Sequence, residues 1–377
     1  MKLAFIKKRF FLYGGAERYL DTLLQYLKQS GHEIHIFANK WTQSADIIIH
    51  KIDVFPVSSF LSTITFNQNV KKAIDNAVGL DCIISFERTT CQDIYRAGEG
   101  CHVEWLKLRE LVEPVWKRVT CRFNPLHVAL LSLEKKLFSL SKLIIANSKM
   151  VKQQIVMNYG IPEQKICVIY NGVDLQRFSA QNKNKWRADV RKELSISENG
   201  KLILFVGSGF KRKGLLTLLR SLTKLTSDSS AGDIHLLVIG KGNIDKFKSI
   251  TNKFGVQKNV IFLGTQKMVE KFYAAADIFV LPTIYDPFSN ATLEAMASGL
   301  PAITTVNNGA SEIIEEGVEG FILHDLFDYN GLALRIKNAL SSSVEMGENA
   351  RHKAESFPIK KAAEEFMGVI QLFKNVL

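Results

Sequence analysis

The 377-residue sequence lacks the features that mark membrane-spanning and secreted proteins. No window approaches the roughly 18 uncharged apolar residues of a spanning helix. At the N-terminus a short apolar run, LAFI, precedes the basic cluster, whereas a signal peptide places its charge first. The five cysteines form no CxxC pair, and their odd number excludes a complete internal disulfide framework. We therefore expect a cytoplasmic protein with reduced cysteines.

The sequence also lacks the residue patterns of metal and nucleic-acid sites. There is no DxD triplet, and the eight histidines include no HxxxH or HExxH pair. This spacing predicts that no metal ion is bound. There is no RNP-type aromatic motif or helix-turn-helix signature, so nucleic acid is not an expected partner.

Positive charge is in excess, with a formal net charge of +12. Residues 1–170 contribute +8 of it, from 23 Lys and Arg against 15 Asp and Glu. A basic N-terminal half favours an acidic partner, such as a phosphorylated substrate or an anionic membrane surface. Net charge of this kind also serves solubility alone, and that alternative stays open.

Two successive series of alternating strands and helices run along the chain. The first begins with a buried strand at 2–6, a glycine turn, a helix of period 3.6 at 17–30 and a strand at 32–38. The second begins with a strand at 201–206. Further strands are expected at 47–49, 82–86, 143–146, 235–239, 260–262, 278–281 and 302–304, and further helices at 66–78, 126–141, 214–225, 268–276 and 291–298.

This alternation predicts an α/β protein with two Rossmann-like domains, residues 1–170 and 171–358. The last segment, 359–377, is expected to be a helix that returns to the N-terminal domain. In parallel sheets of this kind, ligands bind beyond the carboxyl ends of the strands. Residues that carry chemistry should therefore come from the turns that follow strands.

The turn GSGFKRKG, residues 207–214, follows one expected strand and opens a helix. Its backbone N–H groups would bind an anion, and Lys211, Arg212 and Lys213 add three positive charges. A diphosphate leaving group needs such charge, because negative charge develops on it as the bond to the sugar breaks. The turn is not a Walker loop, and a solvated basic turn is the alternative.

The segment DPFSNATLEAMASGLP, residues 286–301, places two carboxylates around the start of a helix. Asp286 precedes the helix, and Glu294 falls in its first turns. We expect the N–H groups of Asn290–Leu293 to point toward a ligand, because the first amides of a helix have no partner within it. An acid pair favoured only by the helix dipole is the alternative.

Asp286-x7-Glu294 followed by AMASGLP resembles the E-x7-E signature of glycosyltransferase family 4, and the preceding FYAAADIFVLPTIYDPF is also similar. The basic turn, the ANS at 146–148 and the stretch AGEGCH most resemble the lipopolysaccharide core glucosyltransferase I group. Other segments match the family in the same order: GGAERYL (14–20), VIYNGVDLQRF (168–178), KGLLTLLRSL (213–222), LLVIGKG (236–242), VIFLG (260–264) and NNGASEII (307–314).

The resemblance implies a GT-B fold, in which two Rossmann-like domains face each other across a central cleft. It implies a monomeric, metal-independent, retaining hexosyltransferase that needs no cofactor and takes a UDP-sugar, with glucose the expected hexose. Lys213 would hold the donor phosphates, Glu294 the ribose, and Asp286 the C3–C4 side of the sugar. The implied donor-binding residues are Gly14, Gly15, Gly207, Lys211, Arg212, Lys213, Asp286, Ser289, Asn290, Ala291, Thr292 and Glu294.

The chain departs from the family at three positions. Asp286 stands where Glu is usual, Phe288-Ser289 replaces the usual FG, and Ser208 replaces an Arg that many members carry. The shorter arm of Asp286 requires a closer loop or another sugar pose, so the sugar is not assigned from this position.

The glycine-rich turn in YRAGEGCHVEWLKLRE, residues 95–110, carries Glu99 and His102. By resemblance these residues face the transferred sugar, and Glu99 matches an Asp of the resembling group. Either side chain could orient the acceptor hydroxyl or accept its proton. A histidine without function is an equal alternative for His102. The residues do not decide between internal return and double displacement.

The stretch 102–136 mixes Trp105, Trp116 and Phe123 with many Lys and Arg residues on an interrupted helix. This mixture suits an anionic bilayer interface, so we expect a peripheral protein on the inner face of the cytoplasmic membrane. A helix that packs on its own domain is the alternative.

The expected acceptor is a lipopolysaccharide core or a related glycan. Other polysaccharide, lipid or small-molecule acceptors stay open, as does a non-catalytic nucleotide-sugar-binding protein. An epimerase of similar architecture is a weaker alternative.

Overall fold

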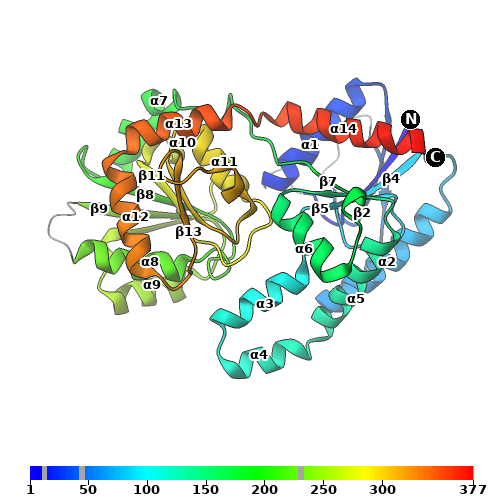
Figure 1. Ribbon diagram of the computed structural model, residues 1–377, viewed down its shortest axis with the longest axis horizontal. Helices are drawn as coiled ribbons and strands as arrows, with labels where there is room; N and C mark the ends of the chain where they lie inside the picture. Colours follow the sequence, from blue (N-terminus) through cyan, green and yellow to red (C-terminus); the bar gives the residue numbers. More distant parts are fainter. Residues whose placement is uncertain (11–14, 42–46, 228–232, 377) are drawn as a thin grey trace. The chain divides into compact units, whose positions relative to one another are not determined.

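The structure is a computed structural model that describes residues 1–10, 15–41, 47–227 and 233–376. The chain divides into two compact units (Figure 1). Unit 1 comprises Met1–Asn171 and Lys360–Leu377, and unit 2 comprises Gly172–Ile359. Each unit is an α/β domain with one parallel sheet, as the alternation of strands and helices predicts.

Unit 1 contains a seven-stranded sheet in the order β3-β2-β1-β4-β5-β6-β7, with every pairing parallel. In the central strand, the run Leu3-Ala4-Phe5-Ile6 is completely buried. Such a run is expected where helices cover both faces of a parallel sheet. The strands are β1 (Lys2–Ile6), β2 (Glu33–Ala38), β3 (Ile48–Lys51), β4 (Cys82–Ser85), β5 (Ile94–Ala97), β6 (Leu143–Ala146) and β7 (Ile166–Val168).

Among the described residues of unit 1, six α-helices lie between the strands, and a seventh comes from the end of the chain. That seventh helix joins the core of unit 1, because Phe366 is fully buried with its ring centroid 6.0 Å from that of Phe86. The helices are α1 (Gly15–Gln29), α2 (Ser59–Asp75), α3 (His102–Val112), α4 (Val115–Arg122), α5 (Pro125–Leu140), α6 (Lys149–Tyr159) and α14 (Ile359–Val376), with a short 3-10 helix, η1 (Glu163–Lys165).

Unit 2 contains a six-stranded parallel sheet in the order β10-β9-β8-β11-β12-β13. Its strands are β8 (Lys201–Val206), β9 (Ile234–Ile239), β10 (Val260–Gly264), β11 (Ile278–Leu281), β12 (Ala302–Thr305) and β13 (Gly320–Leu323). Its helices are α7 (Asn182–Glu193), α8 (Leu215–Thr226), α9 (Ile244–Phe254), α10 (Glu270–Ala275), α11 (Asn290–Ala297), α12 (Tyr329–Ser341) and α13 (Ser343–Ala354), with η3 (Gln257–Asn259) and η4 (Gly309–Ile313).

Strand β5 was not among the strands expected from the sequence, because a central Arg interrupts its apolar pattern. Arg96 is only 6% exposed. Its guanidinium lies 4.4 Å from the ring centroid of Tyr19 and 5.4 Å from that of Phe86, and it donates a hydrogen bond to Asn171. Stacking on two aromatic faces stabilises a buried guanidinium, which explains how this strand tolerates it.

The stretch 102–136 forms α3, α4 and most of α5. Figure 1 shows α3 and α4 standing away from the sheet of unit 1. Val115, Trp116 and Phe123 are 70%, 65% and 76% exposed. In the part of the chain that the structure describes, no helix has the length and apolar character needed to span a bilayer.

Candidate active site

The phosphate-type turn of unit 2 lies between β8 and α8. Gly214 caps α8 with φ of 76°, and a Cβ there would lie 1.7 Å from the carbonyl oxygen of Pro282. A Cβ on Gly240 would lie 2.2 Å from the carbonyl oxygen of Gly207. Glycine is therefore required where the turn packs against the segments that follow β9 and β11.

Lys213 forms an ion pair with Asp286, and their side chains are only 11% and 9% exposed. Burial lowers the pKa of Lys213, as does the neighbouring Arg212, whereas Asp286 acts in the opposite direction. Lys213, which the resemblance assigned to the donor phosphates, and Asp286, which it assigned to the sugar, thus contact each other directly. A buried ion pair of this kind holds both side chains in fixed positions.

The other two cations of the turn have different surroundings. Arg212 donates from Nη1 to the carbonyl oxygen of Tyr285 at 3.0 Å, and its own carbonyl accepts from the Ile284 amide at 2.8 Å. Arg212 therefore joins the turn to the segment that carries Asp286. Lys211 is exposed.

Asn308 organises the segment around Asp286, and the sequence analysis did not single it out. Its side chain is completely buried and accepts from the Ser289 amide at 3.0 Å and the Ala310 amide at 3.1 Å. It donates to the hydroxyls of Thr292 at 3.2 Å and Thr304 at 2.8 Å. Asn308 lies three residues after the end of β12, in the segment 307–314, which matched the family as a segment without pointing to this residue.

The start of α11 differs in one respect from the expectation. The Ser289 hydroxyl accepts from the Thr292 amide at 3.4 Å, and the Ser289 carbonyl accepts from the Leu293 amide at the same distance. These two amides are therefore satisfied within the protein, because Ser289 is the N-cap. This excludes Thr292 and Leu293 from the predicted ligand-facing amides at Asn290–Leu293. Asn290 and Ala291, the first two residues of α11, are half-buried.

Glu294 lies on α11 and is half-buried. Its Oε2 accepts a hydrogen bond from the Tyr273 hydroxyl at 3.0 Å, which fixes the carboxylate. Of the expected glycines, Gly207 packs against Lys213, since a Cβ there would lie 3.0 Å from its Cγ. Gly15 is the first residue of α1. Gly14 lies outside the described residues.

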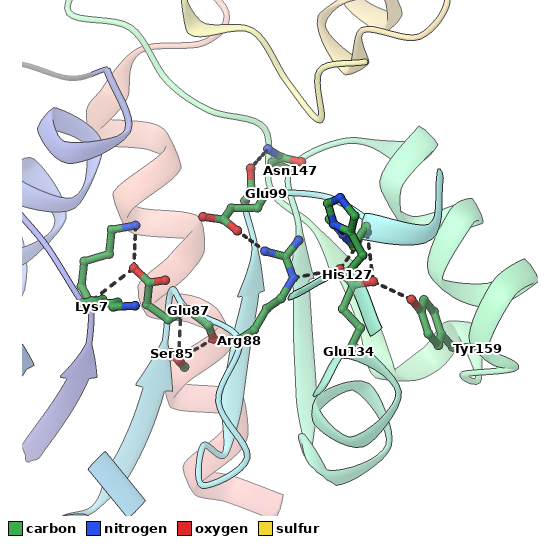
Figure 2. A network of polar contacts seen from close by, with 12 residues as sticks. Lys7, Ser85, Glu87, Arg88, Glu99, His127, Glu134, Asn147 and Tyr159 are labelled. Atoms are coloured by element: carbon green, nitrogen blue, oxygen red, sulfur yellow. Dashed lines mark hydrogen bonds and ion pairs between the residues drawn. The ribbon is translucent and has the colours of Figure 1, made fainter. Parts of the chain in front are cut away.

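In unit 1, Glu99 follows β5 and pairs with Arg88, whose Nε donates to Glu134 Oε1 at 2.9 Å (Figure 2). The Glu99 side chain is 51% exposed, whereas Arg88 is 10% exposed and Glu134 completely buried. Partial burial would raise the pKa of Glu99, but the charges of Arg88 and Lys7 lower it below the ordinary value. Glu99 is therefore an ionised carboxylate that solvent can reach.

His102 is the first residue of α3, and its amide donates to the two oxygens of Glu134 at 2.7 and 2.9 Å. Its Nε2 lies 2.9 Å from Nδ1 of His127. Burial above all, together with Arg88 and His127, lowers the pKa of His102 to about 3. The imidazole is therefore neutral near pH 7 and a weak base.

The structure brings Glu99 and His102 into one network through Arg88 and Glu134, two residues that sequence reasoning missed. The Tyr159 hydroxyl adds a 2.5 Å hydrogen bond to Glu134 Oε2 (Figure 2). No sequence signal identified Glu134, because a single acid on the apolar face of α5 resembles a surface residue until its partners are known. Among the described residues, no group of three or more His, Cys, Asp or Glu could hold a metal ion.

Comparison with known proteins gives two adjoining family matches. Residues 13–177 match the family described as Glycosyltransferase Family 4, and residues 187–356 match Glycosyl transferases group 1. The lipopolysaccharide glucosyltransferase WaaG of Escherichia coli is 25% identical over 379 residues, which cover 98% of both chains.

Solved structures show the same fold. The crystal structure of WaaG, described as a glycosyltransferase involved in lipopolysaccharide biosynthesis, has a TM-score of 0.84 and 22% identity over 98% of this chain and 99% of that chain. HepE of Anabaena, solved in complex with UDP-glucose, has a TM-score of 0.73 and 17% identity over 98% of this chain and 99% of that chain. The GT-B fold expected from the sequence is confirmed.

Proposed function

Because the chain belongs to glycosyltransferase family 4, we propose that it is a retaining hexosyltransferase that moves glucose from UDP-glucose to a lipopolysaccharide core or related glycan. The proposal assigns donor binding to unit 2 and acceptor binding to unit 1. The likeness to WaaG supports the acceptor class, and the UDP-glucose complex of HepE supports the donor.

The observation that carries the proposal is the buried pair of Lys213 and Asp286. Lys213 is held at the start of α8, where the helix dipole also favours an anion. A donor diphosphate would contact this ammonium and draw it partly from Asp286, which frees a carboxylate for sugar hydroxyls. The positive charge of Lys213 then stabilises the negative charge that develops on the departing diphosphate. Because the ammonium is already in place, no solvent dipoles have to reorient during the reaction.

Glu294 would bind the ribose hydroxyls. The hydrogen bond that its Oε2 accepts from the Tyr273 hydroxyl would orient this carboxylate. The half-buried Asn290 and Ala291 lie at the start of the same helix, where amides suit phosphate or sugar oxygens.

Glu99 would accept a hydrogen bond from the acceptor hydroxyl and orient it. Arg88 lowers the pKa of Glu99, and the pKa of His102 is about 3, so both groups are weak bases. A departing diphosphate is then better suited than either side chain to take the hydroxyl proton. Attack on the face that the diphosphate leaves would retain the anomeric configuration. No metal or cofactor is part of this proposal.

The exposed side chains of α4 would place the enzyme at an anionic membrane on the cytoplasmic side. Trp116 and Phe123 are largely exposed, and Lys117 and Arg118 accompany them on this helix. Aromatic and basic side chains together favour the headgroup region of an anionic bilayer. The acceptor of a lipopolysaccharide-type reaction would be presented at that surface.

A ligand screen tests the proposed function. UDP-, GDP- and ADP-glucose are compared for protection of the protein against thermal unfolding, because a ligand that binds only the folded state raises Tm. We expect UDP-glucose to raise Tm of the wild type and of Lys224→Ala, an exposed control on α8, but much less that of Lys213→Ala. Product analysis by NMR then identifies the anomer. No shift with any nucleotide sugar contradicts the proposal.

A further inference from the structure

A basic pocket in unit 1 lies outside the site described so far. Its volume is about 490 Å³, and it is lined by residues that follow β1 and by the start of α2. The residues that line it include Lys7, Lys8, Arg9, Ser59, Ser62 and Glu87.

The charge of this pocket is positive. Among the described residues that line it, Glu87 is the only acid. This carboxylate is already paired, since its Oε1 lies 3.2 Å from Lys7 Nζ and accepts from the Lys8 amide at 3.1 Å. Lys8 and Arg9 have no ion pair with any described residue. Burial lowers the pKa of Lys8, whereas the charge of Glu87 raises it and that of Arg9 lowers it, so the ammonium has lost part of its hydration. An anion in the pocket would compensate both charges.

The hydroxyl groups of the pocket also indicate an anionic ligand. Ser62 is only 6% exposed, and its hydroxyl forms no hydrogen bond with a described residue. This hydroxyl can therefore donate a hydrogen bond to a ligand oxygen in the pocket. The pocket also borders the start of the 17-residue helix α2, where the Ser58 hydroxyl accepts from the Leu61 amide at 3.1 Å. The amides of Ser59 and Phe60 precede Leu61, and the helix dipole favours negative charge there.

The pocket is connected to the carboxylate of the proposed acceptor site. Glu87 lies on its wall, and the next residue, Arg88, holds Glu99 (Figure 2). Both features lie beyond the carboxyl ends of strands of one sheet, β1 and β4 for the pocket and β5 for Glu99.

We infer that this pocket binds a phosphate group carried by the acceptor and thereby positions the acceptor hydroxyl at Glu99. The inference rests on the proposed function, since only a transferase has an acceptor to position. It narrows the substrate to a phosphorylated sugar or glycan. Lys8 and Arg9 would supply charge-assisted hydrogen bonds, which are the strong ones for phosphate, and the Ser62 hydroxyl would donate a further one.

Titration calorimetry at constant ionic strength tests the inference with inorganic phosphate, glucose 6-phosphate and glucose. The phosphate turn of unit 2 is a second place where phosphate could bind, so each titration is repeated on Lys213→Ala. We expect both phosphates, but not glucose, to bind the wild type and Lys213→Ala. Lys8→Gln/Arg9→Gln should weaken binding at least about tenfold, because it removes two charge-assisted contacts. Lys71→Gln/Lys72→Gln, the same charge change on exposed positions of α2, should not.

Ser62→Ala gives a milder variant in case the double variant does not fold, and it should weaken binding at least about threefold through the loss of one hydrogen bond to the phosphate. No binding to the wild type, unchanged affinity in the pocket variants, or an equal loss in the control overturns the inference. UDP-glucose binding is measured on the same proteins. Phosphate binding through Lys8 and Arg9 with no UDP-glucose binding would contradict the proposed function and the acceptor role, leaving an oxyanion site.

Discussion

Both units place a cation against a carboxylate beyond the carboxyl ends of their strands, but they expose the carboxylate differently. In unit 2, Lys213 and Asp286 are 11% and 9% exposed. In unit 1, Arg88 is 10% exposed, whereas Glu99 is 51% exposed. A ligand can reach Glu99 without displacing its partner, but a ligand at Lys213 must compete with Asp286. The difference suits a charged diphosphate in unit 2 and a neutral hydroxyl in unit 1.

The largest expected effect concerns stability in unit 1. Arg88→Ala leaves the completely buried Glu134 without its cation, and breaking a buried pair in this way costs about 3–5 kcal/mol. Urea unfolding measures the change. Lys142→Ala, which removes an exposed lysine from its pair with the half-buried Asp93, should cost less than about 1 kcal/mol. Equal losses in the two variants would show that the network in unit 1 is not held by Arg88.

Lys213→Ala should have the largest effect on catalysis. We expect kcat to fall at least about 10²-fold, the scale for losing one group that stabilises developing charge. Steady-state UDP release with UDP-glucose measures it, and Lys224→Ala on the same helix is the control. A rate near that of the wild type would refute the phosphate role and make the buried pair purely structural.

His102 should make stability depend on pH. Its pKa is about 3 in the folded protein and 6.5 in the reference state. The unfolded chain therefore binds the proton more readily, so the contribution of His102 is complete above pH 6.5 and is lost as pH falls toward 3. Between pH 7 and pH 5 the loss is about 2 kcal/mol. His102→Gln should flatten this part of the profile in urea unfolding at stepped pH. If the dependence of stability on pH were the same in His102→Gln as in the wild type, it could not be attributed to His102.

Glu294→Ala should have the smallest effect. We expect the Kd of UDP-glucose to rise about tenfold, since hydrogen bonds from ribose to a carboxylate are lost, while Tm stays near that of the wild type. Tyr273→Phe keeps the carboxylate and removes only the hydroxyl that orients it, so its effect should be smaller. Calorimetry compares the variants, and unchanged donor binding in Glu294→Ala excludes the ribose role.

Much of unit 2 could be predicted from the sequence. The strands at 201–206 and 278–281 begin and end where the sequence predicted them. A short, continuous apolar run between turn residues is typical of a buried strand, so its ends can be found from the sequence. Both units also contain strands that were not predicted, β5 and β7 in unit 1 and β13 in unit 2. Strand β5 escaped prediction because Arg96 interrupts its apolar pattern, and only contacts with two aromatic rings allow that residue there.

The candidate site shows the same limit. The turn at 207–214 and the pair Asp286 and Glu294 could be found, since they stand in local motifs. The organising positions of Asn308, Arg88 and Glu134 could not, because each depends on partners that are distant in sequence. Arg88 and Glu134, for example, are 46 residues apart.

The sequence by itself determined the two series of strands and helices, and the glycines at the turns, because periodicity and backbone freedom act over a few residues. Only the tertiary structure decided which charges meet. Lys213 and Asp286 are 73 residues apart, and they pair because β8 and β11 are neighbours in the sheet. Burial by the surrounding core then lowers the pKa of Lys213 in that pair and the pKa of His102 in the other unit.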